Sequence, residues 1–279
     1  MPGYLVPDGR PARPLAGALA NGGMVIPGPQ PGTAWVQATV GATSMPLVRM
    51  DGTETGVSVR LPPRIDTSPA TSDGRGGVLV VSYPGGMYDD VPPGGFHRIA
   101  GTVAAVGPTR WLIVDCQTGH RCSNAILDPA TGARHTLPGA AAAPSPGALP
   151  GVVAPDGSAA AMVRASGDRV TLHLLNLVSG SDQGIAVSLD QESADGQTLA
   201  WSPDSRWLFA AASPVQARTL IAVNARTRRA ANLGVTLPQV SQVAVESTPP
   251  LTKPHGSLGT CHPTSPWITG HRSRGRSCS

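Results

Sequence analysis

The chain of 279 residues is long enough for two ordinary domains or one large all-β domain. Residues 1–246 balance 17 Arg against 17 Asp and Glu, so the net charge of +4 comes from residues 247–279, which hold Lys253 and three Arg. Residues 1–246 have no net charge and no basic cluster, so they give no reason to expect a nucleic-acid partner. No apolar run approaches the roughly 18–20 residues of a membrane helix.

The composition is typical of a chain with many turns. Gly (34) and Pro (29) are frequent, whereas Lys253 is the only Lys against 20 Arg. The Arg bias and the many Ala are typical of a GC-rich genome of the actinobacterial type. The N-terminal segment MPGYLVPDGRPARPL has no basic start followed by an apolar core, so it is not a signal peptide, and the chain as written is expected to be cytoplasmic.

Short apolar runs recur along the chain and predict β-strands. Each has the length of one strand, and none sustains the 3.6-residue apolar period of a helix. The clearest are GVLVVSY (77–83), RWLIVDC (110–116), VTLHLLNL (170–177) and RTLIAVN (218–224). An all-β fold is therefore expected.

Two kinds of turn alternate between these runs. The first kind joins two apolar runs and lies near Pro27, Asp73, Pro108, Pro155 and Pro203. The second joins a strand to a shorter one, within residues 5–15, 48–59, 87–99, 126–137, 176–187 and 222–233. The second kind recurs about every 43 residues, which suits a repeat of four short strands, as in a blade of a β-propeller.

Two stretches carry a resemblance to a known family. LAWSPDSRWLFAA (199–211) and APDGSAAAMV (154–163) resemble the repeat of TolB-like, WD-type propellers, in which a Ser-Pro-Asp-Gly turn links the first two strands of a blade. The resemblance implies a β-propeller of four-stranded antiparallel blades over residues 1–246, and it implies no particular reaction.

The turn order predicts how the ring begins and ends. The chain starts in mid-blade with two strands, and LPQVSQVAV (237–245) supplies one more first strand. Either these ends share a sixth blade, or the ring is an incomplete piece of a larger one. Residues 247–279 are predicted to be a disordered basic tail, and a frame-shifted origin of this tail is a hypothesis.

Cys116 and Cys122 flank a short loop between two predicted strands. A disulfide is favoured, and two free thiols or a metal pair remain as alternatives. A disulfide indicates an oxidising space such as the cell envelope. The missing signal peptide then leads us to expect a signal or membrane anchor upstream of Met1.

The segment SYPGGMYDDVPPGGFH (82–97) is the predicted contact loop, because it concentrates aromatic and acidic residues between Gly and Pro. The candidate binding residues are Tyr83, Met87, Tyr88, Asp89, Asp90 and Phe96.

Motifs for catalysis and for cofactors are not found. There is no Walker-A loop, dinucleotide fingerprint, G-x-S-x-G elbow or H-E-x-x-H helix, so no catalytic residue, metal or cofactor is predicted. The residue types that some propeller hydrolases use are present at His97, His135, His173, Asp89, Asp115 and Asp128. His173 is interpreted as a strand-face residue and the turn aspartates as turn formers. The spacings of His255, Cys261, His262, His271 and Cys278 fit no zinc pattern.

Tryptophans recur in or beside the predicted strands, at Trp35, Trp111, Trp201 and Trp207. We expect them to pack between blades.

Taken together, the sequence predicts a monomeric, non-catalytic propeller that binds a protein or small ligand, in the cell envelope. The alternatives are a propeller hydrolase, the accessory propeller of a peptidase, or a gene fragment without function.

Overall fold

In the computed structural model the chain divides into two compact units, Met1–Ser247 and Thr248–Ser279. The structure describes residues 4–5, 13–14, 24–37, 39, 42–61, 70–82, 87–91, 97–116, 122–139, 150–166, 169–187, 189, 198–212, 218–237 and 245. The predicted tail, with its Cys and His residues, lies outside them. The described residues form strands and turns and include no helix long and apolar enough to cross a membrane.

The strands form five four-stranded antiparallel blades and one two-stranded sheet, which confirms the predicted all-β propeller. The two-stranded sheet pairs β1 (Tyr4–Leu5) with β2 (Arg13–Pro14). Blade 1 consists of β3 (Met24–Pro27), β4 (Thr33–Gln37), β5 (Ser44–Arg49) and β6 (Glu54–Arg60). Blade 2 consists of β7 (Ala70–Ser72), β8 (Val78–Ser82), β9 (Met87–Val91) and β10 (His97–Arg98). Blade 3 consists of β11 (Thr102–Val106), β12 (Trp111–Cys116), β13 (Cys122–Leu127) and β14 (Arg134–Leu137). Blade 4 consists of β15 (Gly151–Val153), β16 (Ala159–Ser166), β17 (Arg169–Asn176) and β18 (Asp182–Ile185). Blade 5 consists of β19 (Leu199–Trp201), β20 (Trp207–Ala212), β21 (Arg218–Asn224) and β22 (Ala230–Leu237).

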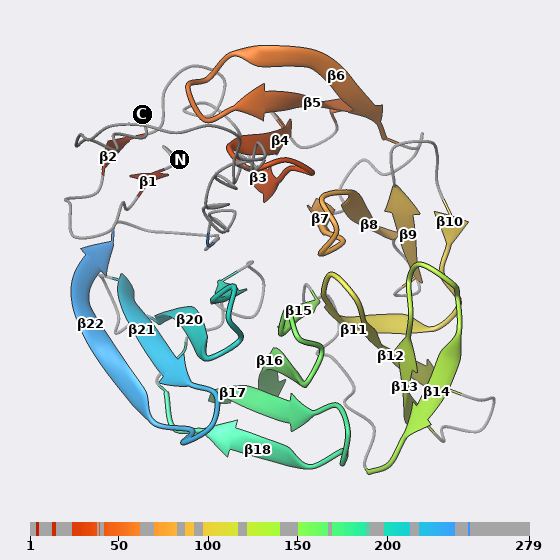
Figure 1. Cartoon of the computed structure of the whole chain (residues 1–279), viewed down its shortest axis with the longest axis vertical. Coiled ribbons are helices and arrows are strands. Elements are labelled where there is room, and N and C mark those ends of the chain that lie inside the picture. The colour runs from red at the N-terminus through yellow and green to blue at the C-terminus, as the bar shows by residue number, and fades with distance from the viewer. Residues whose placement is uncertain are drawn as a thin grey trace, which may run out of the picture. The chain divides into compact units, whose positions relative to one another are not determined.

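The blades of the first unit fan around a common centre, with β3, β7, β11 and β15 nearest to it and β6, β18 and β22 at the outside (Figure 1). Among the first strands β3 contacts β7, and β15 contacts both β11 and β19. The strands β11 and β15 pair in parallel, which joins blades 3 and 4 into one sheet. The ring therefore follows the order of the repeats in the sequence.

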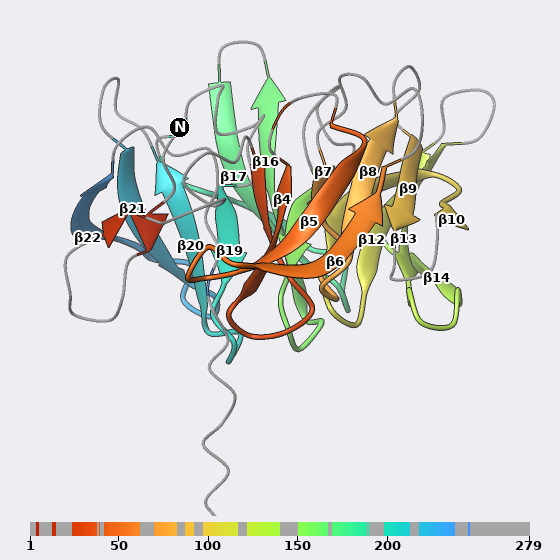
Figure 2. The ribbon, with the colours of Figure 1, turned by 90° about the horizontal axis from the view of Figure 1, so that it is seen from above.

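The predicted turns lie where the alternation placed them. All five turns of the first kind join the first and second strands of a blade. The second-kind turns within 48–59, 126–137, 176–187 and 222–233 join the third and fourth strands, whereas the linking residues of those within 5–15 and 87–99 lie outside the described residues. Asp and Asn shape them: the side chain of Asp156 accepts the amide of Ser158 at 2.9 Å, and the side chain of Asn224 accepts the amide of Thr227 at 2.9 Å. The described turns of both kinds project from the same side of the sheets, the lower side in Figure 2, which we name the turn face.

Buried side chains form layers between successive blades, so blades 2, 3 and 4 each pack a neighbour on both of their faces. Leu79 of blade 2 packs in one cluster with Trp111 and Ile113 of blade 3. Similar clusters join blades 1 and 2, blades 3 and 4, and blades 4 and 5. Burial on both faces explains why the strands read as nearly continuous apolar runs.

Of the four tryptophans that we expected between blades, three pack there. Trp35, Trp111 and Trp201 are buried, and each indole N–H donates to a backbone carbonyl of a neighbouring blade. The acceptors are Gly76 at 2.7 Å, Asp73 at 2.9 Å and Val152 at 3.1 Å, respectively.

The prediction for Trp207 is wrong, because its side chain keeps 38% of its exposure. Trp111 and Trp207 both begin a second strand, but the turn before Trp111 is one residue shorter. A shift of one residue moves a strand side chain to the opposite face. Leu208 therefore takes the place that faces the preceding blade, where it packs with Leu172, and Trp207 faces the other way.

Candidate functional site

Part of the predicted contact loop is a β-strand in the structure. Met87, Tyr88, Asp89 and Asp90 lie in β9, which pairs with β8 on one side and β10 on the other, so this part is a strand and not an irregular loop. Tyr83 and Phe96 lie outside the described residues. The use of this segment in binding stays a prediction.

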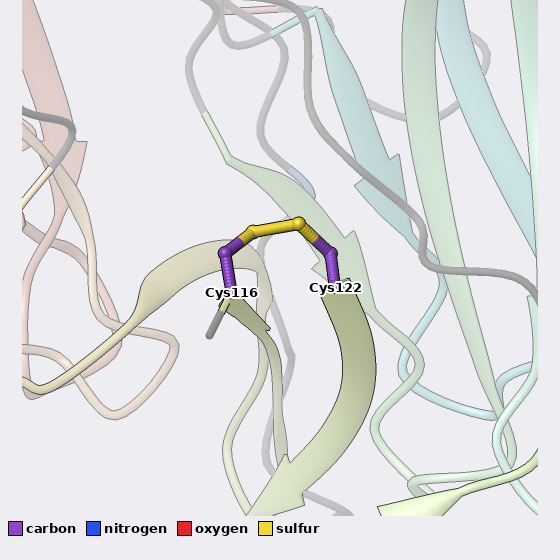
Figure 3. Close-up of a disulfide and its surroundings, with 2 residues drawn as sticks. All are labelled: Cys116 and Cys122. Atoms are coloured by element: carbon purple, nitrogen blue, oxygen red, sulfur yellow. A yellow bond between two sulfur atoms is a disulfide. The ribbon is translucent and has the colours of Figure 1, made fainter. Parts of the chain in front are cut away.

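The expected disulfide between Cys116 and Cys122 is present. The two residues face each other directly across β12 and β13, with their Cα atoms 4.0 Å apart (Figure 3). Cys122 packs against the apolar cluster that joins blades 3 and 4. The bond therefore closes the end of this hairpin beside the contact between the two blades.

The polar residue types that a propeller hydrolase could use are spread over the outer strands and their turns. His97 lies in β10, His135 in β14 and His173 in β17, while Asp115 lies in β12, one residue before its end, and Asp128 lies in a turn. No group of three His, Cys, Asp or Glu that could hold a metal occurs among the described residues. The first strands nearest the centre, over their described lengths, carry neither carboxylate nor imidazole.

A different group of residues gathers at the end of blade 5 on the turn face. The turn before β20 contributes Arg206, and β20 itself begins with Trp207. The turn between β21 and β22 contributes Arg226, Arg228 and Arg229. The amide of Ala225 donates to the carbonyl of Arg206 at 2.9 Å, so the two turns lie against each other. We name these five residues the Arg–Trp patch.

Strand register places the indole of the patch next to the second turn. Trp207 pairs with Asn224 across β20 and β21, and the amide of Asn224 donates to the carbonyl of Arg229 at 2.9 Å. Directly opposed residues share one face of a sheet. Trp207, Asn224 and Arg229 therefore form a row across the ends of three strands.

The second turn of the patch has a fixed backbone. The side chain of Asn224 accepts the amides of Arg226 at 3.1 Å and Thr227 at 2.9 Å, and its carbonyl accepts the amide of Arg228 at 2.9 Å. Arg228 has a φ of 60°, a left-handed conformation that non-glycine residues rarely adopt. Its Nη1 is buried and has no hydrogen-bond partner. The turn thus holds three arginines in a short arc without using all their donors.

Positive charge dominates the patch. The one carboxylate in these two turns is Asp204, whose Oδ2 lies 3.6 Å from Nε of Arg206. A hydrogen bond from the hydroxyl of Ser202, together with the amide of Arg206, lowers the pKa of Asp204 below its usual value, so the carboxylate stays ionised. The two turns beside Trp207 thus carry four arginines against one carboxylate.

The turn face is braced from blade to blade. Nη1 of Arg110 in blade 3 donates to the carbonyl of Gly157 in blade 4 at 3.2 Å, and the amide of Asp156 donates to the hydroxyl of Ser205 in blade 5 at 3.0 Å. Ser205 also has a positive φ, of 59°. The bond from Asp156 to Ser205 thus ties the turn that precedes Trp207 to blade 4.

Sequence reasoning missed the Arg–Trp patch. Averaged over residues 1–246 the charges cancel, which led to the expectation that the body has no basic cluster. The local run NARTRR (224–229) was the available signal, but only the pairing of β20 with β21 brings Arg206 and Trp207 beside it.

Comparisons with known proteins show the fold. No protein-family model matches the chain, and no curated protein matches it in sequence. A candidate TolB from Agrobacterium tumefaciens matches with a TM-score of 0.51 at 10% identity, over 76% of this chain and 80% of that one. Hydrazine synthase of Kuenenia stuttgartiensis matches with a TM-score of 0.46 at 11% identity, over 76% of this chain and 66% of that one, just under two thirds. The Swd1 β-propeller domain of Myceliophteria thermophila matches with a TM-score of 0.43 at 10% identity, over 82% and 77%. With its five described blades and its match to the candidate TolB, the chain has a β-propeller fold similar to the fold of that protein.

Proposed function

We propose that this chain is a non-catalytic β-propeller that binds an acidic segment of another protein on its turn face, through the Arg–Trp patch. The observation that carries the proposal is the exposed indole of Trp207 among four arginines and a single carboxylate. Trp and Arg are the residues most enriched at the energetic centres of protein interfaces.

The chemistry of the patch favours carboxylates. Guanidinium groups bind them with paired N–H donors, and an indole adds apolar contact area beside the charges. Neighbouring strands lie about 4.8 Å apart, so the row from Trp207 to Arg229 spans roughly 10 Å. An extended peptide with acidic residues at alternate positions, roughly 7 Å apart, can place carboxylates on both sides of the indole.

Rigidity of the turn face supports a binding role. The bonds from Arg110 to Gly157 and from Asp156 to Ser205 fix the turns before a partner arrives. A preorganised surface loses less conformational entropy on binding.

The disulfide supports a place for this function outside the cytoplasm, because such bonds persist in oxidising compartments. Thiol labelling of the native protein at the moment of cell lysis tests this. We expect Cys116 and Cys122 to resist labelling until a reductant is added. Labelling without reductant would place the protein in a reducing compartment.

Fluorescence anisotropy with a dye-labelled oligo-aspartate peptide tests the binding role. We expect saturable binding that weakens as salt is raised, since exposed charges are screened. The double variant R226Q/R229Q should weaken it by about tenfold, at roughly 0.5 kcal/mol for each exposed contact and some cooperation between them. Arg49, an exposed arginine of blade 1, provides the matched control R49Q, which should leave binding unchanged.

Two outcomes would overturn the proposal. The first is an absence of saturable binding to the peptide, and the second is equal weakening by R49Q and by R226Q/R229Q. Tighter binding of a single-stranded oligonucleotide of the same charge would show that the patch recognises nucleic acid instead. The segment 82–97 stays a predicted second contact, and the variant Y83A/Y88A tests it in the same assay.

A further inference from the structure

A second polar cluster lies on blade 4, away from the Arg–Trp patch. Nη1 of Arg164 in β16 lies 2.5 Å from Oδ2 of Asp182 in β18, and Nδ1 of His173 in β17 lies 3.1 Å from Oδ1 of the same carboxylate. Since an ionised carboxylate only accepts, Nδ1 carries the proton and donates. The other ring nitrogen of His173 lies 3.0 Å from the hydroxyl of Thr171.

These four residues share one face of the blade. Arg164 pairs with Thr171, Met162 pairs with His173, and Leu175 pairs with Asp182. Residues two apart along a strand point to the same side. Met162 and Leu175 belong to the apolar cluster that joins blades 3 and 4, so the polar cluster continues that seam.

The guanidinium of Arg164 is only partly used. Its Nη1 holds Asp182, but Nε and Nη2 are both buried and have no hydrogen-bond partner. Because these two atoms are shielded from solvent, bulk water does not satisfy them. Buried donors without a partner are rare in folded proteins, and two on one guanidinium call for an acceptor.

The two unused donors define the shape of that acceptor. Nε–H and the adjacent Nη2–H lie along one edge of the planar group and point the same way, which matches the two oxygens of a carboxylate. Asp182 binds only the Nη1 side of the guanidinium, so the second edge has two donors and no acceptor. The hydroxyl of Thr171, directly across the strand pair from Arg164, lies at the same end of the cluster.

We propose that the Nε–Nη2 edge of Arg164 is a binding site for a single carboxylate at the seam between blades 3 and 4. The side chains of Arg164 and His173 keep 22% of their exposure, so the cluster is open to solvent at one side. We include in this proposal a shift of the Arg164 side chain toward that opening, because Nε and Nη2 are shielded from solvent in the present conformation. The ligand is therefore small at its acidic end, either a free organic acid or the carboxyl terminus of a peptide.

Proton–nitrogen correlation spectra of the arginine side chains test the site directly. The Nε–H resonance of Arg164 is assigned by its loss in R164K. This variant keeps a positive charge beside Asp182 but lacks the paired donors of the Nε–Nη2 edge. In the wild-type protein we expect sodium acetate to move this resonance in a saturable way, while sodium chloride at equal ionic strength does not. The variant R226Q in the Arg–Trp patch should give the same titration, since that patch is not involved.

A peptide with a free carboxyl terminus and its amidated twin distinguish the sources. A shift with the free terminus at lower concentration than acetate assigns the site to a peptide end, and a shift with acetate alone assigns it to a free acid. A resonance that ignores both, or follows chloride equally, overturns the proposal. A shift with inorganic phosphate but not with acetate overturns the carboxylate assignment. None of these readouts depends on the Arg–Trp patch or on its partner.

Discussion

Replacing the tryptophans that follow the two similar turns tests the blade packing most sharply. Trp111 is buried between blades 2 and 3, and its indole N–H donates to the carbonyl of Asp73 at 2.9 Å. In W111F this carbonyl loses its donor, which lowers the free energy of unfolding by about 1–2 kcal/mol. In W111A the loss of the whole ring costs about 3–5 kcal/mol.

Trp207 provides the matched control. It follows a similar Arg in a similar turn, but its side chain is 38% exposed. W207F should change the free energy of unfolding by no more than about 0.5 kcal/mol.

Urea denaturation followed by circular dichroism measures these differences. By thermal denaturation, W111A should melt roughly 6–20 °C lower than the wild type for a unit of this size. If W207F destabilises as much as W111F, the one-residue difference in turn length does not place the two indoles on opposite faces, and the reasoning fails.

Three further predictions follow from single features. A Cβ at Gly76 would lie 2.3 Å from a backbone atom of the neighbouring blade, whereas a Cβ at Gly32 would meet open space at a similar positive φ. G76A should therefore lower the free energy of unfolding by about 1–3 kcal/mol more than G32A does. Equal losses of this free energy in urea denaturation would contradict the blade contact. Reduction of the Cys116–Cys122 disulfide should lower the free energy of unfolding by about 2 kcal/mol, because the bond closes only a short loop. A larger loss would mean that the bond holds the blades together. The hydroxyl of Thr53, and then its amide, hold the pKa of Asp51 below 3.8, so the contribution of this turn is complete above that pH and is lost as pH falls through the lowered pKa. The variant T53V should raise this pKa in a carboxyl-carbon NMR titration, and an unchanged pKa would refute the assigned cause.

Local chemistry made much of the fold predictable. Each turn depends on a few adjacent residues, such as Pro155 and Asp156 or Asn224, whose backbone preferences act whatever the rest of the chain does. The spacing of these turn residues also predicted the lengths of the strands between them. The repeat of about 43 residues then gave four strands per blade and their order.

Contacts between distant segments were harder to predict. The exposure of Trp207 depends on which face of β20 it occupies, and the Arg–Trp patch depends on the pairing of Trp207 with Asn224. Likewise His173 looked like an ordinary strand residue, and only the approach of Arg164 and Asp182 from neighbouring strands shows a cluster around it. Such sites arise from register, which a one-residue shift changes completely.

Acrylamide quenching of tryptophan fluorescence tests the proposed binding surface most directly. Trp35, Trp111 and Trp201 are buried, whereas Trp207 is exposed, and subtracting the signal of W207F isolates its contribution. Saturating oligo-aspartate peptide should shield Trp207 from acrylamide in the wild-type protein and should not do so in R226Q/R229Q. If Trp207 stays equally accessible while the peptide is bound, the acidic partner binds elsewhere and the Arg–Trp patch is not its site.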